Sequence, residues 1–308
     1  MLTAGIDAGG SKTECIIVDS ESNNIITRAE TGAANYQVVG LKKACREIKS
    51  ALNQAKARAG ISKLSVIGIG MAGAGRENDK IKLKKELDQI IETEFFLTDD
   101  AQIALLGATG AKAGIVLIAG TGSIAYGLKK SGHKIRSGGW GPLIGDEGSG
   151  FWIALEAIKK AVKASENRAE ATQLQALIID YFNLDSLQEL IPFIYEGELP
   201  RREIAALTPE VIKLAENGDK AAAAIIKEAV FELNLLVNSL VERLDYQEDK
   251  IFTVGGLFKS SYFSNIFADD LIKNYNLKTL SPKYSAAYGA VFFALNELKK
   301  RNKNSSEK

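Results

Sequence analysis

Two short glycine-rich turns in similar surroundings constrain this chain more than any other feature. The first, Asp7–Thr13, follows the apolar run Leu2–Ile6. The second, Ala119–Ser123, follows the apolar run Ile115–Ile118. Each turn leads into another alternating apolar segment and then a polar turn, so the pattern predicts one kind of hairpin twice.

The composition of these turns suits the binding of an anion. Glycine lets backbone N–H groups approach an anion closely, and serine or threonine hydroxyls add further donors. Two such hairpins facing each other would hold a polyphosphate from both sides. Either turn alone is equally consistent with an ordinary tight hairpin, and it is the repetition that favours phosphate binding.

Length and charge exclude several classes of protein. The chain has 308 residues, enough for two domains with separate cores. A formal net charge of +1, from 39 basic and 38 acidic residues, argues against a large nucleic-acid-binding surface. No apolar run reaches membrane-spanning length, and a strand is expected directly after Met1, so we expect neither a membrane segment nor a signal peptide.

Cysteine and histidine are too few for most metal or nucleophile chemistry. Cys15 and Cys45 form no metal-binding or redox motif, and a reducing cytoplasm is the simplest setting for them. His133 is the single histidine and lies in a polar turn, where we expect it to be solvated. A catalytic triad that depends on histidine is therefore excluded.

The chain is predicted to form two α/β domains. Residues 1–112, completed by a closing helix over 286–299, would form the first domain, with the boundary near Thr109–Ala113. Residues 113–285 would form the second, with a helical insertion, and the charged residues 300–308 a disordered tail. Strands are expected over Leu64–Gly70, Glu94–Leu97 and Lys250–Val254, and helices over Leu41–Arg58, Asp79–Ile91, Ala101–Ala108, Phe151–Lys163, Ala171–Phe182, Glu203–Glu216, Lys220–Leu244 and Ala286–Lys299.

Two adjacent carboxylates, Asp99 and Asp100, stand where a strand is expected to meet a helix. Acidic residues favour helix N-termini, so one of the two is expected to be a plain N-cap. The other is placed to act as a base on a substrate hydroxyl, because strand ends in open α/β sheets commonly carry such groups.

The segment Gly138–Ser149 combines five glycines with Trp140 and two acidic residues. Sugars are commonly held by an aromatic face together with carboxylates that accept hydrogen bonds from hydroxyls. The alternative is a structural turn in which Trp140 plugs the core. Because a plain linker needs neither Trp140 nor Asp146, we favour a binding loop.

Two familiar nucleotide-binding motifs fail their context tests. Gly68–Gly73 matches the spacing of a dinucleotide-binding fingerprint, but no apolar helix follows it. Gly5–Lys12 approximates a P-loop, but Ser11 separates Gly10 from Lys12, and a strand rather than a helix follows.

Three segments together resemble a known superfamily. Asp7–Thr13, Ala119–Ser123 and Thr253–Gly256 are similar to the two phosphate loops and the adenosine loop of the actin-like ATPases and sugar kinases. Within that superfamily, Gly138–Gly141, and Gly145–Ser149 with the following Trp152–Ala154, most resemble the N-acetylglucosamine kinase family. That family belongs to the ATPase group that includes the benzoyl-CoA reductase and dehydratase activators. The similarity runs from Ile6 to about Ile158 and returns near Gly255 and over Ala286–Ala294.

The resemblance implies a fold and a set of roles. The fold is the two-domain actin-like ATPase fold, a duplicated ribonuclease H-like α/β unit with an interdomain cleft. Asp100 matches the family's catalytic aspartate, and Asp7 matches the acidic residue near the metal. Sugar-binding positions match Asn35, Thr121, Trp140, Gly141 and Asp146. ATP-binding positions match Gly9, Gly10, Ser11, Lys12, Thr13, Gly120, Thr121, Gly122, Ser123, Gly255 and Gly256.

The implied function is an ATP- and Mg²⁺-dependent kinase that phosphorylates an amino sugar, N-acetylglucosamine or glucosamine, at the 6-hydroxyl. Glucose and N-acetylmuramate remain open as substrates, and an ATPase that activates or regulates a partner enzyme is the alternative function. Against the activator, Cys15 and Cys45 do not match the paired cysteines that hold its iron–sulfur cluster. Against a repressor-type sugar kinase, the Cys/His zinc motif is missing. The resemblance also implies a homodimer. Because the expected site lies between two domains, we expect the domains to close on the sugar and exclude water.

Overall fold

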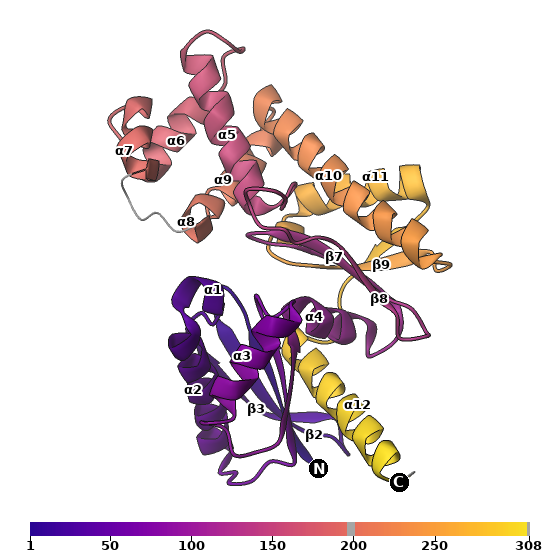
Figure 1. The fold of residues 1–308 in the computed structure, drawn as a ribbon. Coiled ribbons are helices and arrows are strands. Elements are labelled where there is room, and N and C mark those ends of the chain that lie inside the picture. The colour runs from indigo at the N-terminus through magenta and orange to yellow at the C-terminus, as the bar shows by residue number, and fades with distance from the viewer. Residues whose placement is uncertain (196–200, 307–308) are drawn as a thin grey trace. The chain divides into compact units, whose positions relative to one another are not determined.

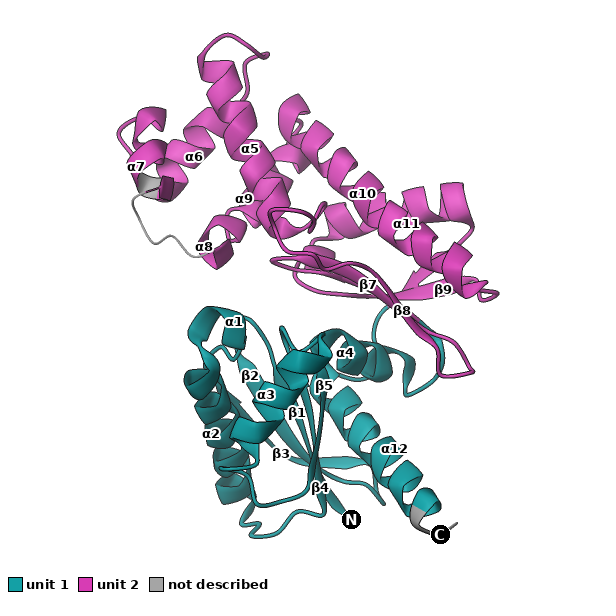
Figure 2. Cartoon of the chain, viewed as in Figure 1, with its two compact units in different colours: residues 1–114, 281–308 teal, residues 115–280 magenta. Residues whose placement is uncertain are grey.

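The computed structural model describes residues 1–195 and 201–306, and the chain divides into two compact units (Figure 2). Unit 1 comprises Met1–Gly114 and Ser281–Lys308, and unit 2 comprises Ile115–Leu280. The boundary expected from the sequence, between residues 112 and 113, lies close to this division. The C-terminal segment, Ser281–Lys308, belongs to unit 1.

Unit 1 is built on a five-stranded mixed sheet in the order β3-β2-β1-β4-β5. The central strand β1 pairs antiparallel with β2 and parallel with β4, and β4 pairs parallel with β5. The glycine turn joins β1 to β2, as the sequence predicts. The strands are β1 (Leu2–Ala8), β2 (Thr13–Asp19), β3 (Asn24–Thr31), β4 (Val66–Met71) and β5 (Phe95–Asp99).

Unit 2 repeats this arrangement with a sheet in the order β10-β9-β6-β7-β8. Its first strand in the chain, β6, is again central, with the next two strands on one side and the last two on the other. The predicted duplicated α/β fold is therefore confirmed at the level of sheet topology. The strands are β6 (Gly114–Ala119), β7 (Ser123–Leu128), β8 (Lys134–Gly138), β9 (Lys250–Val254) and β10 (Lys278–Leu280).

Helices cover both faces of the unit 1 sheet (Figure 1). Alternate residues of β1, such as Ala4 and Ile6, share a core with α2, while the opposite face of the sheet packs against α12. The helices are α1 (Tyr36–Val39), α2 (Leu41–Ala59), α3 (Glu77–Leu87), α4 (Asp100–Thr109) and α12 (Ala286–Ser306).

Two paired glycines let α12 lie directly on this sheet. Gly5 of β1 and Gly68 of β4 are register partners. A Cβ atom at Gly5 would lie 2.0 Å from the carbonyl oxygen of Ala287, and one at Gly68 would lie 1.9 Å from that of Ala290. Both contacts are with backbone atoms, which cannot yield, so any side chain at either position would force the helix off the sheet.

The C-terminal tail is more ordered than its composition suggests. Residues 300–306, expected to be disordered, continue helix α12, and residues 307–308 lie outside the described part of the chain. Propagation of an existing helix costs little, because each added residue makes one further hydrogen bond. Lys300 pairs with Glu297 at 2.7 Å, and Arg301 pairs with Glu94.

The helical part of unit 2 differs from the prediction in three places. A short helix, α7, lies over Leu190–Tyr195 where none was expected, and α6 begins at Leu174 instead of Ala171. A single helix was expected over Glu203–Glu216, but the structure has α8 and α9, because Pro209 lies in the first turn of α9 and starts a new helix. Within the described residues, no helix is long and apolar enough to cross a membrane. The helices are α5 (Gly150–Ser165), α6 (Leu174–Phe182), α7 (Leu190–Tyr195), α8 (Arg201–Ala205), α9 (Thr208–Glu216), α10 (Lys220–Leu244) and α11 (Ser261–Tyr275), with short 3₁₀ turns at Leu187–Glu189 and Leu257–Lys259.

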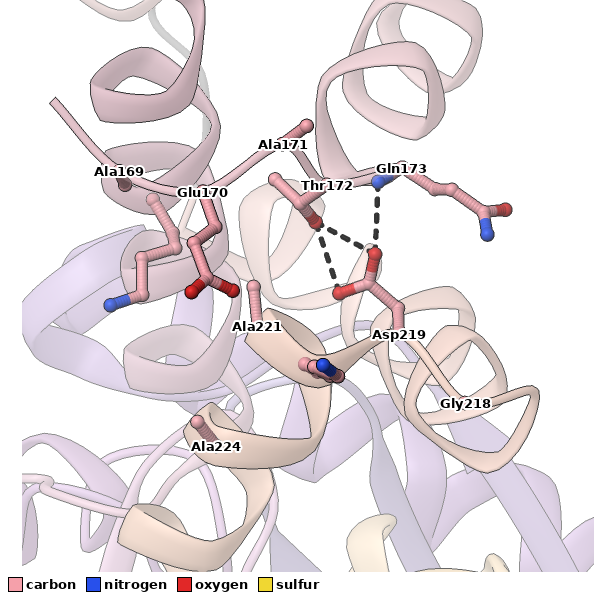
Figure 3. Close-up of a pocket in the computed structure, with 11 residues that line it drawn as sticks. Ala169, Glu170, Ala171, Thr172, Gln173, Gly218, Asp219, Ala221 and Ala224 are labelled. Carbon is pink, nitrogen blue, oxygen red and sulfur yellow. Dashed lines mark hydrogen bonds between the residues drawn. The ribbon is translucent and has the colours of Figure 1, made fainter. Parts of the chain in front are cut away.

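A pocket of about 750 Å³ lies among these helices, between α5, the segment before α6 and the start of α10 (Figure 3). Its most buried carboxylate, Asp219, is the N-cap of α10. Asp219 accepts hydrogen bonds from the Thr172 hydroxyl at 2.8 Å and from the backbone N–H groups of Gln173 and Ala222, both at 2.9 Å. The carboxylate therefore joins the segment before α6 to the start of α10. None of the lining residues is a predicted site residue.

We expect Asp219→Ala to lower the free energy of unfolding by about 1–2 kcal/mol, because it removes an N-cap together with bonds to the neighbouring segment. Asp219→Asn has an amide oxygen that can still cap α10, so its free energy of unfolding should fall by less. Urea unfolding of both variants measures the difference. Equal stability of Asp219→Ala and the wild type would show that this cap contributes nothing.

Candidate active site

The parallel strands of unit 1 bring three acidic residues to one edge of its sheet. Asp7 of β1 is in register with Gly70 of β4, which is in register with Thr98 of β5. Asp99 and Asp100 follow Thr98 directly, so they share the carboxyl edge of the sheet with Asp7. This edge is where open α/β sheets place their ligands.

The structure separates the roles of the adjacent aspartates. Asp99 is the N-cap of α4, and its carboxylate accepts a hydrogen bond from the Gln102 N–H at 2.8 Å. Asp100 lies in the first turn, and its carboxylate accepts from the neighbouring Ala101 N–H at 3.0 Å. The plain capping role that sequence analysis expected for one of the pair therefore belongs to Asp99.

Burial and the charge of neighbouring carboxylates raise the pKa values of two acidic residues at this edge. The pKa of Asp7 is raised to about 7, first by burial and then by the charges of Asp100 and Glu14, with Lys12 acting in the opposite direction. The pKa of Asp100 is raised to about 6, first by burial and then by the charge of Asp99. Raised pKa values of this kind are typical of functional sites, where burial and like charges disfavour the ionised form of a carboxyl group.

Two loops join the end of β1 at the same edge. The Ala34 N–H donates to the Gly9 carbonyl, and the Ala72 N–H donates to the Ala8 carbonyl, both at 3.0 Å. The first of these loops leads to Asn35, which caps α1 by accepting from the Gln37 N–H at 3.1 Å. Because the Asn35 oxygen is used in capping, its NH₂ group is the part that can donate to a ligand.

The first glycine turn is partly open and partly committed to structure. The Gly9 N–H donates to the Lys12 carbonyl at 3.0 Å, while Gly10, Ser11 and Lys12 are exposed. Lys12 pairs with Glu30 at 2.5 Å. Thr13 is fully buried, and its hydroxyl donates to the Gly32 carbonyl at 2.8 Å. In this structure the Thr13 hydroxyl thus fixes the loop that leads to Asn35.

The second glycine turn, in unit 2, is bound to the start of α5. The Gly120 carbonyl accepts from the Gly150 N–H at 2.8 Å, and the Thr121 carbonyl accepts from the Phe151 N–H at 3.2 Å. Thr121 is exposed, whereas the buried Ser123 donates its hydroxyl to the Glu147 carbonyl at 2.8 Å. The turn and the loop that contains Glu147 therefore form one local structure.

Asp146 faces this second turn. A Cβ atom at Gly122 would lie 2.8 Å from the Asp146 carboxylate, so a side chain there would displace it. The carboxylate accepts hydrogen bonds from the backbone N–H groups of Ser123 and Gly141. Its pKa is nevertheless raised, because burial outweighs these bonds and the charge of Arg201.

Trp140 is 63% exposed, which excludes the alternative in which it plugs the core. The Arg136 guanidinium lies over the Trp140 ring, 5.0 Å from the ring centroid. The same loop exposes Leu143 and Ile144. An exposed aromatic residue beside an oriented carboxylate fits a binding loop better than a structural turn.

The predicted adenosine-side glycines follow β9, next to the second turn. Val254 is in register with Ile118, so Gly255 and Gly256 leave the sheet beside Ala119. Gly255 has a φ of +120°, and a Cβ atom there would lie 2.1 Å from the Ala119 carbonyl oxygen. Gly256 has open space around it. The structure thus gathers the predicted unit 2 residues in one place.

A family comparison agrees with this arrangement. The model of the BadF/BadG/BcrA/BcrD ATPase family matches residues 4–294, which is nearly the whole chain. The chain belongs to this ATPase family. The match includes the helical insertion of unit 2, over which sequence analysis found little resemblance.

Relatives of this ATPase family member include named sugar kinases. The chain is 36% identical over 300 residues to an N-acetylmuramic acid/N-acetylglucosamine kinase of Clostridium acetobutylicum, covering 95% of this chain and 98% of the relative. It is 29% identical to an N-acetyl-D-glucosamine kinase of Dictyostelium discoideum, covering 96% and 98%. A solved structure of a candidate N-acetylglucosamine kinase from Chromobacterium violaceum matches with a TM-score of 0.80 at 25% identity, covering 94% and 98%.

Sequence analysis missed one charged residue of this ATPase's unit 2 site. Arg201 begins α8 in the helical insertion, and its charge acts on Asp146. The insertion is fixed to the same region, because the Thr208 hydroxyl donates to the Gly150 carbonyl at 2.5 Å. No motif marks Arg201, since its relation to Asp146 exists only in the folded chain.

Replacing Asp7 or Asp100 with asparagine should stabilise the protein. Each carboxylate has a higher pKa in the folded protein than in the unfolded chain, where it is near 4. The free energy of unfolding therefore falls as the pH rises from the unfolded pKa to the folded pKa. The melting temperature of Asp7→Asn should therefore exceed that of the wild type most above pH 7, and the gap should close near pH 4. For Asp100→Asn, the difference in melting temperature from the wild type should reach its full size by about pH 6.

Differential scanning fluorimetry from pH 4 to 8, without nucleotide or metal, makes this measurement. Glu92→Gln, at an exposed carboxylate, controls for the loss of one negative charge. A lower melting temperature for both asparagine variants at pH 8 would contradict the electrostatic strain inferred here.

Proposed function

We propose that this chain is an ATP-dependent kinase that phosphorylates the 6-hydroxyl of an amino sugar, N-acetylglucosamine or glucosamine. The observation that carries the proposal is the position of Asp100, a partly buried carboxylate at the sheet edge. Because Asp99 caps α4, the Asp100 carboxylate is not needed as the cap. The names of the relatives, which are kinases for amino sugars, support the substrate class.

Asp100 would accept the proton of the sugar hydroxyl as that oxygen attacks the γ-phosphorus. The bond from the γ-phosphorus to the bridging oxygen of ATP would break, and ADP would leave. Phosphoryl transfer needs little covalent work from the protein, so positioning and charge stabilisation carry most of the catalysis. A base works best when its pKa lies near the operating pH, and burial raises the pKa of Asp100 to about 6.

The sugar would be held by groups with complementary hydrogen-bonding capacity. The Asn35 NH₂ group would donate to a sugar oxygen, and the Asp146 carboxylate would accept from sugar hydroxyls. Trp140 would offer its exposed face to the C–H groups of the ring, with the Thr121 hydroxyl and the backbone of Gly141 beside it.

The glycine turns would hold the ATP phosphates. Gly9–Lys12 would supply backbone N–H groups from unit 1, and Gly120–Ser123 would supply them from unit 2. Gly255 and Gly256 would adjoin the adenosine. Because Thr13 and Ser123 already donate their hydroxyls to carbonyl groups, we assign them to shaping the turns rather than to direct phosphate contact.

Asp7 fits a Mg²⁺ ion shared with ATP. Its carboxylate is a hard oxygen ligand whose pKa is raised first by burial and then by the charge of Asp100, and a nearby cation would favour its ionised form. When bound, the ion would neutralise charge on the phosphates. Mg²⁺ typically takes only one or two protein carboxylates and keeps water ligands, so a cluster of acidic residues is not required.

A homodimer in the cytoplasm completes the proposal. The dimer rests on family resemblance alone, and the location rests on Cys15 and Cys45, which form no metal-binding or redox motif. Sedimentation equilibrium of the purified chain tests the dimer. The activator alternative has less support, because Cys15 and Cys45 are both buried free thiols in unit 1, and the burial of Cys15 raises its pKa to about 12.

A coupled assay for ADP release with a panel of sugars tests the function. The expected result is ATP turnover that depends on N-acetylglucosamine or glucosamine, with little turnover on glucose. ATP hydrolysis that no sugar stimulates would favour the activator instead.

Asp100→Asn should reduce phosphoryl transfer on the order of 10²–10⁴-fold while leaving ATP binding nearly unchanged, because only the base is lost. In the wild type, kcat/KM should fall as the pH drops through about 6, where Asp100 takes up a proton. Steady-state kinetics with calorimetric ATP binding measures both effects. Asp99→Asn is the matched control, since asparagine also caps helices. Loss of activity in Asp99→Asn but not in Asp100→Asn would reverse the assignment.

Asp146→Ala and Trp140→Ala should raise the KM for sugar much more than the KM for ATP, because both residues are assigned to the sugar. Leu143→Ala serves as a control, since Leu143 is 92% exposed in the same loop. Steady-state kinetics with each substrate varied in turn gives the two KM values. An unchanged sugar KM in both variants, with a lower melting temperature, would return this loop to a structural role.

A further inference from the structure

The loop after β4 packs closely against the helix that Asn35 begins. Gly73 has a φ of +86°, and a Cβ atom there would lie 3.1 Å from the Tyr36 ring and 3.2 Å from the Asn35 side-chain oxygen. Both Asn35 and Gly73 follow strands that end at the same edge of the unit 1 sheet. The backbone at Gly73 therefore borders the position assigned to the sugar.

A network of polar side chains fixes Arg76 at the end of this loop. The Arg76 Nε donates to the Asp79 carboxylate at 2.5 Å. Asp79 is buried, and its carboxylate is also hydrogen-bonded to the Tyr36 side chain. Since Tyr36 directly follows Asn35, one buried carboxylate sets the position of Arg76 relative to Asn35.

Arg76 is nevertheless largely open to solvent, with 73% of its side chain exposed. A guanidinium carries five N–H donors, so the bonds to the Asp79 carboxylate and to the Tyr36 side chain leave donors for a second anion. Arginine suits carboxylate recognition because its planar fork can donate two parallel hydrogen bonds.

The chain between Gly73 and Arg76 has almost no side-chain bulk. Ala74 carries only a methyl group, and a Cβ atom at Gly75 would meet no other atom within 4 Å. Ala72, which precedes Gly73, is equally small. The loop thus leaves room for a substituent on the sugar and ends in a cation.

We propose that Arg76 binds a carboxylate carried by the sugar, so that the enzyme accepts an amino sugar with an acidic ether substituent as well as the unsubstituted sugar. This inference rests on the proposed function, because it takes Asn35 as a sugar ligand. N-acetylmuramate is the representative of this class, since it is N-acetylglucosamine with a lactyl ether on its 3-oxygen. The 6-hydroxyl is unchanged in it, so Asp100 would act in the same way on both sugars.

The test compares three sugars in the wild type, Arg76→Gln and Arg76→Lys: N-acetylglucosamine, N-acetylmuramate and the methyl ester of N-acetylmuramate. The ester keeps the bulk of the substituent and removes its charge. Arg76→Gln should lower the ratio of kcat/KM for N-acetylmuramate to kcat/KM for N-acetylglucosamine by roughly 10- to 100-fold, the worth of a hydrogen bond to a charged group. Arg76→Lys should recover part of this ratio, because it restores the charge without the fork.

The wild-type preference for N-acetylmuramate over its ester should disappear in Arg76→Gln. Arg46→Gln, at an exposed arginine on α2, should leave all ratios unchanged. An Arg76→Gln variant that loses the same factor on every sugar, or none on N-acetylmuramate, would overturn the proposal and leave Arg76 a structural residue.

Calorimetric binding of N-acetylmuramate without ATP separates this inference from the proposed function. If no sugar is phosphorylated but N-acetylmuramate binds in a way that Arg76→Gln weakens, the kinase assignment fails and the carboxylate site stands. If N-acetylmuramate does not bind the wild type, the carboxylate site is wrong, whatever the activity on other sugars.

Discussion

The burial of two carboxylates, Asp7 and Asp100, at one sheet edge is the constraint on which the candidate site of unit 1 depends. Parallel pairing of β1, β4 and β5 brings both carboxylates to one sheet edge. Burial raises both pKa values, and the charge of Asp100 adds to the effect on Asp7 as the charge of Asp99 adds to that on Asp100. An arrangement that costs stability persists in a folded protein when a function requires it. Two carboxylates that resist ionisation suit a site that receives a cation and a proton.

Close packing of glycines holds this strained edge in place. Gly5 and Gly68 let α12 lie on the sheet, and a Cβ atom at Gly70 would lie 2.3 Å from the Ile103 side chain of α4. Because Gly70 is the register partner of Asp7, the same approach that seats α4 also fixes the helix on which Asp100 stands. The C-terminal helix and the N-terminal strand thus support one site, although they are distant in the sequence.

Unit 2 uses the same sheet order for a different purpose. Its central hairpin again carries a glycine turn, but the turn is bound to the start of α5 and to the Asp146 loop. In unit 1, β4 ends in a loop of small residues that leads to Arg76, whereas β9, its topological counterpart, ends in Gly255–Gly256 beside Ala119. The two units therefore share one sheet topology, and they differ in the residues of the loops that follow the strands.

The sequence by itself determined the two glycine hairpins and most helices, because apolar periodicity and turn chemistry are local properties. It indicated the family through the resemblance of its glycine-rich segments to those of known members. It did not divide 203–216 into α8 and α9 or extend α12 to Ser306. It identified Asp99 and Asp100 as a pair, but only the structure showed that Asp99 caps α4 and that Trp140 is exposed. It gave no sign that Arg201 acts on Asp146, or that a buried Asp79 links Arg76 to Tyr36. These relations join residues far apart in the chain, and their energies come from burial and distance, which exist only once the chain has folded.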